Sequence, residues 1–324
     1  MNNFPITEVS ECTNLGLLIN NTLNWTPHIK RKCEKVSKPL TVLYKYKYIL
    51  PHIAFERLYL SMILPVLEYG DIIYDNCSNL AGQTIEQIQR HAALICTGAY
   101  RHTENQSLLQ ELGWETIASR RKKHKLFQYY KIKHRIYPDY LFRLLHTPTT
   151  IYNLRVTHDH IPRGARLTSS QNSFFPSTTQ AWNDLPDSLK SAASLNEFKR
   201  LLPNPNHINI YYRQCNGIRG SWLTRLRLNL SALNQHRYNY HFIEKPDCLL
   251  CRTPETTTHY FFNCRAYVEA RNTLFSRLSN ELSIHTLDHQ SLLDTILHGT
   301  PDRANHHLLL DIIYQYFNTT KRFM

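Results

Sequence analysis

Three cysteines and one histidine near the end of the chain have the residue types and the spacing of a metal site. Two residues separate Cys248 from Cys251, seven separate Cys251 from His259, and four separate His259 from Cys264. A Cys-x-x-Cys pair can wrap a tight turn around a tetrahedral ion, and a further His and Cys complete four ligands. Because protein atoms would fill every position and leave none for water, the spacing predicts one structural Zn²⁺ ion.

Two alternatives to zinc are a redox-active Cys-x-x-Cys pair and a chance grouping in a chain with 18 histidines. A redox pair is expected next to a strand that leads into a helix, and the sequence lacks that context. The other five cysteines are scattered, so we interpret them as small buried apolar residues rather than ligands. They are Cys12, Cys33, Cys77, Cys96 and Cys215.

The chain carries 38 Lys and Arg against 25 Asp and Glu, a formal net charge of +13. Such a surplus favours nucleic acid as a partner, because each neutralised phosphate releases counterions. The positive charge is concentrated in residues 115–135, a predicted helix whose only acid is Glu115. The alternatives for its eight cations are contacts with RNA or DNA phosphates, which we favour, and a solvated face. These cations are Arg120, Arg121, Lys122, Lys123, Lys125, Lys131, Lys133 and Arg135.

The sequence also predicts where the protein is found. Its N-terminal residues lack the basic and then apolar pattern of a secretory signal peptide. No apolar run approaches the roughly 18–20 residues of a membrane span. We therefore expect a cytoplasmic or nuclear protein that is not secreted, has no membrane partner and forms no disulfides.

Helices are expected to position most of these side chains, because the chain has only nine glycines and one clear strand pattern. The sequence predicts a mainly α fold with a short β segment at residues 15–19. Pro39 is expected to kink or break the first helix. Apolar periodicity and capping residues place helices over residues 28–48, 54–69, 80–97, 104–112 and 115–135.

The second half of the chain changes character at residues 146–205, which are rich in Pro, Ser, Thr and Asn and predict a linker. Within this linker, residues 172–176 and 181–186 are expected to be extended and to dock their aromatic side chains onto a neighbouring part of the protein. Ser194 and Glu197 have the spacing of a capping box, which predicts a helix over 194–202. Helices are also expected over residues 222–233, 265–282, 289–297 and 305–317. The predicted domains are residues 1–28, 29–145, 146–205 and 206–324, the last being a small helical zinc-binding domain.

Several short motifs follow one another along the chain. They are Leu15-Gly-Leu-Leu-Ile-Asn with Trp25-Thr-Pro-His28-Ile29, then Leu64-Pro-Val-Leu-Glu-Tyr-Gly70, Ile88-Gln-Arg90 and Leu112-Gly-Trp114, then Asn172-Ser-Phe-Phe-Pro176, Trp182-Asn-x-Leu-Pro186 and Phe198-Lys199, then the Cys/His set. In this order they resemble the end of the palm, the thumb, a segment after the thumb and the zinc-binding tail of reverse transcriptases from non-LTR (LINE-type, jockey-like) retrotransposons.

This resemblance implies that residues 1–28 are the end of a palm, that 29–145 form a thumb which grips a template–primer duplex, and that the tail helps to capture element RNA or target DNA. The family's catalytic Asp-Asp pair would lie before Leu15, and the sequence contains no such motif. Tyr74-Asp75-Asn76 lacks the second carboxylate. Because polymerisation needs carboxylates that hold two divalent metals, we expect no polymerase activity from this chain alone.

The sequence therefore predicts a truncated reverse transcriptase fragment that is not an enzyme, binds RNA or DNA phosphates with low specificity and takes no small-molecule substrate. The alternative is a protein–protein interaction module whose partner is the missing palm domain or another protein, through apolar surface where that palm would dock. A hydrolase is the third reading, and no Ser/His/Asp or Cys/His set at suitable spacing supports it.

Overall fold

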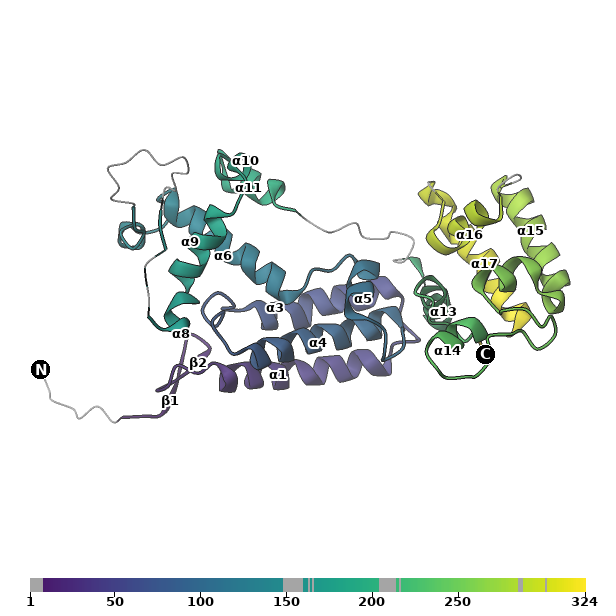
Figure 1. The fold of residues 1–324 in the computed structure, drawn as a ribbon, viewed down its shortest axis with the longest axis horizontal. Helices are drawn as coiled ribbons and strands as arrows, with labels where there is room; N and C mark the ends of the chain where they lie inside the picture. The colour runs from purple at the N-terminus through teal and green to yellow at the C-terminus, as the bar shows by residue number, and fades with distance from the viewer. Residues whose placement is uncertain are drawn as a thin grey trace, which may run out of the picture. The chain divides into compact units, whose positions relative to one another are not determined.

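The computed structural model describes residues 8–147, 160–162, 164, 166–203, 214–215, 217–284, 288–300 and 302–324. It is mainly helical with a two-stranded sheet near the N-terminus, as the sequence predicts (Figure 1). The chain forms two compact units. The first unit consists of Met1–Lys38, Ile63–Gln89 and Glu115–Asn206, and the second of Pro39–Met62, Arg90–Trp114 and His207–Met324.

The two units interleave along the chain, whereas the sequence predicts consecutive domains. The predicted boundary at residues 205/206 lies outside the described residues. The predicted domain boundaries therefore stay a prediction, and each unit is described by itself.

A β-hairpin begins the first unit. β1 (Glu11–Asn14) pairs antiparallel with β2 (Leu17–Asn20), and Asn14 lies opposite Leu17. Leu15 and Gly16 form the turn, with φ of 46° and 80°, the left-handed region that two-residue hairpin turns use. The predicted strand is thus confirmed only from Leu17 onward. β1 was missed because all of its side chains are exposed and leave no apolar alternation in the sequence.

The helices of the first unit follow the hairpin. They are α1 (Thr26–Lys45), α3 (Leu64–Glu68), α4 (Asn79–Thr97), α6 (Ile117–Lys133), α7 (Asp139–Phe142), α8 (Thr168–Gln171), α9 (Phe174–Asn183), α10 (Asp187–Lys190) and α11 (Leu195–Leu201). α1 continues through Pro39, so the prediction of a break is wrong, and the alternative of a kink stays a prediction. α1 and α4 each contribute residues to both units.

Aromatic side chains from three helices form the core of the first unit. Trp182 of α9 lies 6.3 Å from Tyr130 of α6 and 5.4 Å from Phe198 of α11, measured between ring centroids. Figure 1 shows α6 and α9 side by side. Trp182 is 1 % exposed, so the prediction that these aromatic residues dock onto a neighbour is confirmed for this side chain.

The prediction that residues 172–176 and 181–186 are extended is wrong, because Phe174–Asn183 is helical. Pro176 lies in the first turn of α9, where a missing amide breaks no helical hydrogen bond, so this proline does not interrupt the helix. The predicted capped helix is confirmed nearby. The Ser194 hydroxyl accepts a hydrogen bond from the Glu197 amide at 3.2 Å, at the start of α11.

The second unit consists of short helices around a larger core. They are α2 (His52–Leu58) with the π-helical turn η1 (Tyr59–Ile63), α5 (Asn105–Leu112), α13 (Gly217–Arg227), α14 (Asn234–Asn239), the π-helical turn η2 (His259–Asn263), the 3₁₀ turns η3 (Arg265–Tyr267) and η4 (Arg303–Asn305), α15 (Val268–Leu282), α16 (His289–His298) and α17 (His306–Thr320). Most predicted helices are confirmed to within a few residues. The helix predicted over 222–233 ends early, where Asn229 takes a positive φ of 54°.

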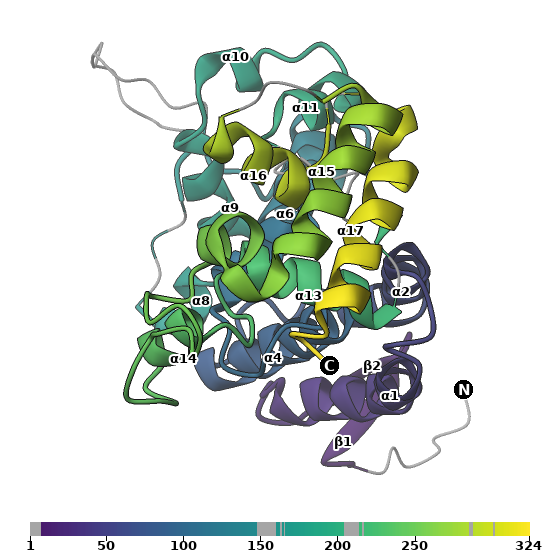
Figure 2. The ribbon, with the colours of Figure 1, turned by 90° about the vertical axis from the view of Figure 1, so that its right-hand side faces the viewer.

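The core of the second unit is built on the run Tyr260-Phe261-Phe262 of η2. Phe261 stacks on Tyr316 of α17, with 5.4 Å between ring centroids. The Tyr316 hydroxyl donates a hydrogen bond to the Tyr260 carbonyl at 2.7 Å. Figure 2 shows α15 and α17 lying side by side. Because η2 begins at His259, the packing of these rings also fixes one member of the Cys/His set.

Candidate metal centre

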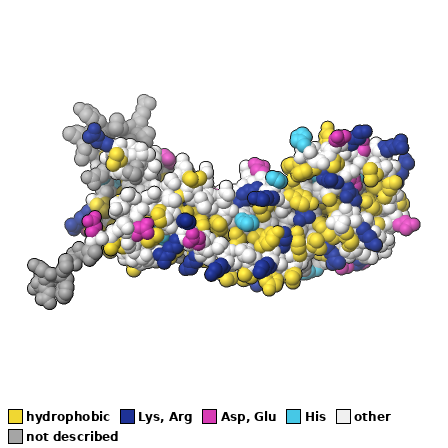
Figure 3. Space-filling view, turned by 90° about the horizontal axis from the view of Figure 1, so that it is seen from below, with side chains coloured by type: hydrophobic (Ala, Val, Ile, Leu, Met, Phe, Trp, Pro, Cys, Tyr) yellow, Lys and Arg dark blue, Asp and Glu magenta, His cyan; other side chains and the backbone are white. Residues whose placement is uncertain are grey.

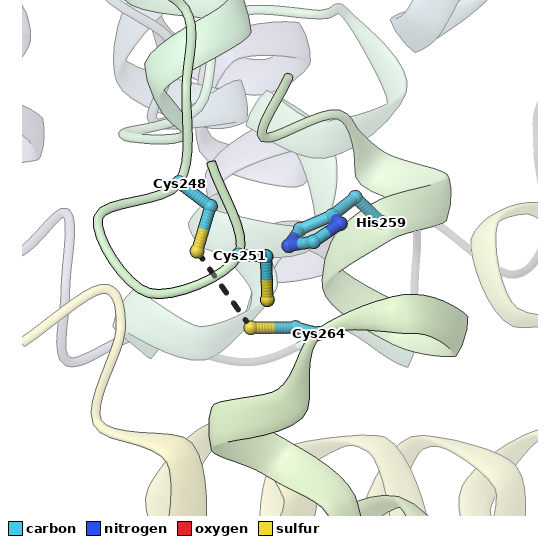
Figure 4. A group of neighbouring side chains, drawn as sticks. All are labelled: Cys248, Cys251, His259 and Cys264. Carbon is cyan, nitrogen blue, oxygen red and sulfur yellow. Dashed lines mark hydrogen bonds between the residues drawn. The ribbon is translucent and has the colours of Figure 1, made fainter. Parts of the chain in front are cut away.

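The predicted ligands come together in the second unit. One donor atom from each of Cys248, Cys251, His259 and Cys264 lies within 4.8 Å of the other three. Cys248 Sγ and Cys264 Sγ are 3.9 Å apart, well beyond the roughly 2.05 Å of a disulfide bond. Figure 4 shows the four side chains pointing toward a common point. The four residues could therefore hold a metal ion.

A tight turn presents the first two cysteines. The Cys248 amide donates to the Thr253 carbonyl at 2.8 Å, and the Arg252 amide donates to the Cys248 carbonyl at 2.9 Å. Arg252 has a φ of 53°, which reverses the chain directly after Cys251. A β-bridge between Asp247 and Pro254 closes the base of the turn.

The second pair of ligands flanks η2. The Thr256 hydroxyl accepts a hydrogen bond from the His259 amide at 3.0 Å, as a residue that caps the start of a helical turn does. Cys264 follows directly after η2, and its amide donates to the His259 carbonyl at 2.8 Å. One short helical turn thus sets the spacing between the imidazole and the third thiol.

The imidazole of His259 is oriented for ligation. Its Nδ1 lies 3.3 Å from the Thr253 hydroxyl oxygen. Its Nε2 is buried and has no hydrogen-bond partner among the residues that the structure describes. A buried nitrogen without a partner is costly unless it binds something, and a metal ion would satisfy it.

The protonation of the site follows from its surroundings. The backbone amide of Arg265 lies 3.3 Å from Cys251 Sγ and lowers the pKa of that thiol. Burial raises the pKa of Cys264 to about 12 and lowers the pKa of His259. The imidazole is therefore neutral and ready to bind. The buried thiol of Cys264 would lose its proton only to a cation that takes its place.

A buried ion pair holds the metal-binding segment against the C-terminal end of the chain. The Arg322 guanidinium bonds both carboxylate oxygens of Glu255, at 2.7 and 2.6 Å. Arg322 also donates to the Ala232 carbonyl, and Glu255 accepts from the Asn234 amide. The sequence gives no sign of this pair, since 67 positions separate its members and no motif connects them.

The basic helix predicted to bind nucleic acid is α6, in the first unit. Four of its cations pair with acids of that unit, three of them with acids far away in the sequence and one with Glu115, just before the helix. Arg120 pairs with Glu68 and Lys123 with Glu115, while Arg121 and Lys125 share Asp75. Arg121 and Lys125 are themselves buried. These contacts hold α6 in its unit.

Of the other four predicted cations, Lys131 and Lys133 are half-buried, Lys122 is exposed, and Arg135 is exposed just beyond the end of α6. Lys131 lies over the ring of Tyr137 and Lys133 over that of Trp182, and Arg135 is 3.8 Å from an oxygen of Asp139. Lys122 is exposed, and no acid among the described residues pairs with it. Contact between α6 and nucleic acid stays a prediction, and Lys122 is the cation most accessible for it.

No protein-family model matches the chain, and comparison with curated proteins and with solved structures gives no match. Among the residues that the structure describes, none of the helices is long and apolar enough to cross a membrane.

Proposed function

We propose that the chain is a zinc-stabilised nucleic-acid-binding protein with no catalytic activity of its own. The observation that carries the proposal is the set of three thiols and one imidazole, all buried except the half-buried Cys251, on a strongly basic chain. Thiolates and imidazole in a tetrahedral arrangement favour zinc. Sulfurs bound to one tetrahedral zinc at about 2.3 Å are separated by ~3.8 Å, close to the 3.9 Å between Cys248 and Cys264.

The ion has a structural role in this proposal. Its four ligands all come from the protein, so no position remains for a water molecule or a substrate. Zinc would fasten the turn at Cys248–Cys251 to the segment that carries Phe261, and hence to the core of the second unit. The cytosol or the nucleus suits such a site, because reducing conditions keep the cysteines as thiols.

The nucleic-acid part of the proposal rests on charge. A net charge of +13 creates a potential that attracts phosphates, and the release of counterions then favours binding. The order of the sequence motifs supports, within the same proposal, an origin in the C-terminal part of a non-LTR retrotransposon reverse transcriptase. In that family the equivalent segments hold template, primer and element RNA.

The test is a titration of the zinc-loaded chain with labelled RNA and DNA, single-stranded and duplex, over a range of salt concentrations. We expect the logarithm of the binding constant to fall linearly with the logarithm of the salt concentration, by close to one unit of slope for each phosphate contacted. Absence of binding below about micromolar concentrations at low salt would overturn the nucleic-acid part of the proposal.

The contribution of α6 is tested by replacing its most accessible cation. Lys122→Glu should weaken binding to all sequences alike and reduce the salt slope by about 1. Arg200→Glu is the matched control, because Arg200 is an exposed cation at the end of α11 and the net charge changes equally. Equal losses from both variants would mean that α6 contributes only through the net charge of the protein.

A protein-binding function is the second candidate, and the tip of the turn between the first two cysteines favours it. Leu249 is 92 % exposed and Leu250 is 69 % exposed. Two adjacent exposed leucines on a metal-held turn are suited to a small apolar contact. This function is favoured if Leu249→Ser with Leu250→Ser leaves nucleic-acid binding unchanged and abolishes capture of a protein partner.

A further inference from the structure

Tyrosine rings and cations of the second unit form a continuous cluster that neither the metal centre nor α6 includes. Lys47 Nζ lies 4.3 Å from the ring centroid of Tyr44 and 4.7 Å from that of Tyr48. The guanidinium carbon of Arg225, in α13, lies 4.3 Å from the ring centroid of Tyr100. Three separate segments of the chain thus contribute cations and aromatic rings that contact one another.

Tyr48 joins the two halves of the cluster. Burial alone would raise the pKa of Tyr48, but hydrogen bonding and positive charge from Lys47 and Arg225 lower it. Arg225 is held in place, since its Nε donates to the Gly98 carbonyl at 2.8 Å. The cluster is therefore positioned before any ligand arrives, which reduces the entropy lost on binding.

The rings are accessible from solvent. Tyr44 is 52 % exposed, and Tyr48 and Tyr100 are each 42 % exposed. Aromatic side chains of this size normally bury most of their surface, so three partly open rings in contact with two cations form an unusual surface. A ring whose face is partly open can stack against another flat ring.

The segments around the cluster are free of acids. Residues 39–51, 90–103 and 217–227 contain no Asp or Glu, and they contain Lys and Arg at seven positions. These are Lys45, Lys47, Arg90, Arg101, Arg219, Arg225 and Arg227, of which Arg227 has a buried side chain and pairs with Glu111. Figure 3 shows Lys and Arg side chains interspersed with hydrophobic ones on the face that it draws. Such a combination favours a ligand that carries both negative charge and flat apolar rings.

We propose that this cluster binds a single-stranded stretch of RNA or DNA, with bases stacked on Tyr44, Tyr48 and Tyr100 and phosphates beside Lys47 and Arg225. The inference rests on the nucleic-acid-binding function proposed above. Unpaired bases have open faces that stack on aromatic rings, whereas bases in a duplex are already stacked on each other. An acidic protein would use the cations but would gain less from the open rings.

The test uses the zinc-loaded chain with a labelled single strand of about 20 nucleotides and a duplex of the same length. Tyr44→Ala and Tyr100→Ala should each weaken single-strand binding by roughly 5- to 100-fold and leave duplex binding within about twofold. Tyr44→Phe and Tyr100→Phe keep the ring and should keep the affinity. Tyr46→Ala is the matched control, because Tyr46 is exposed in the same turn but its ring is not one of those over which Lys47 or Arg225 lies.

The outcomes separate this inference from the proposed function. If the unmodified chain binds neither form of nucleic acid, the proposed function fails and this inference fails with it. If the chain binds but Tyr44→Ala and Tyr100→Ala bind single strands as well as Tyr46→Ala does, only this inference is overturned. Unchanged thermal unfolding of each variant excludes misfolding as the cause of a loss, and the Phe variants distinguish a lost ring from a lost hydroxyl.

Discussion

At the scale of single residues, the four ligands of the metal centre sit in different surroundings. Cys264 is buried, whereas Cys251 is half-buried and receives a hydrogen bond from the Arg265 amide. In the closed site that we propose, the loss of any one ligand would leave an open position on the ion. We expect Cys264, which at 1 % exposure is more deeply buried than Cys248, to be the least replaceable of the three thiols.

Cys264→Ser should release zinc and lower the thermal unfolding temperature of the second unit, because the free energy of metal binding is part of its folding free energy. We expect a loss of at least several kcal/mol, visible by calorimetry together with metal analysis. Cys12→Ser is the control, since Cys12 is far from the ligands in sequence and is exposed, so its predicted burial is wrong. A Cys264→Ser protein that unfolds like the parent chain would show that the ligands hold no structural ion.

A second residue-scale prediction concerns His236, which is buried and accepts a hydrogen bond from the Ser231 amide. Burial lowers the pKa of His236 to about 4. In the unfolded chain the pKa is about 6.5, so the unfolded state binds more protons between these values. Stability from this group is therefore complete above about pH 6.5 and falls, by up to about 3 kcal/mol, as the pH drops toward 4.

The check is urea unfolding of the zinc-loaded chain near pH 7 and near pH 5, with and without His236→Asn. Between these pH values the parent chain should lose about 2 kcal/mol more stability than the variant. Both proteins share any acid-induced loss of zinc, so the difference between them isolates the histidine. Equal losses would contradict the lowered pKa.

Residue spacing could predict the metal ligands because all four lie within a short stretch of sequence. Glu255 and Arg322 could not be predicted, since their contact depends on α17 returning beside the metal-binding segment. The cluster at Lys47 and Arg225 could not be predicted either, because its residues come from three segments that are distant in the sequence.

At the scale of elements, α6 shows that a run of cations in a sequence does not reveal which acids pair with them in the fold. The run predicts unpaired cations, because its only acid is Glu115. In the fold, Glu68 and Asp75 approach from other elements of the first unit and neutralise part of the charge. α9 is a second case in which the fold differs from the sequence pattern. A proline in the first turn of a helix is compatible with the helix, but in the sequence alone it indicates a break.

Asp75 gives the element-scale prediction. Asp75→Asn would leave Arg121 and Lys125 buried without their counter-charge, and we expect the first unit to lose about 3 kcal/mol of unfolding free energy. Asp187→Asn is the control, because Asp187 and Lys190 form an exposed pair whose loss should cost less than about 1 kcal/mol. Chemical denaturation of both variants checks this. Similar small losses from the two would show that the Asp75 pairs do not stabilise α6.

At the scale of the whole molecule, the sequence predicts the mainly helical class and the presence of a metal-binding region near the C-terminal end. The grouping into units depends on contacts between segments far apart in sequence, as in residues 90–114, which belong with residues 207–324. Hydrophobic periodicity finds helices but carries no information about which helices share a core. Consecutive domains were therefore the natural expectation, and the interleaved arrangement was not predictable.

The proposed function depends on whether a metal ion joins the ligands of the second unit. The most direct test is zinc analysis of the purified chain combined with X-ray absorption at the zinc edge. We expect one zinc ion per chain, with three sulfur neighbours at about 2.3 Å and one nitrogen neighbour at about 2.0 Å. A chain without zinc, or zinc surrounded mainly by oxygen, would contradict it.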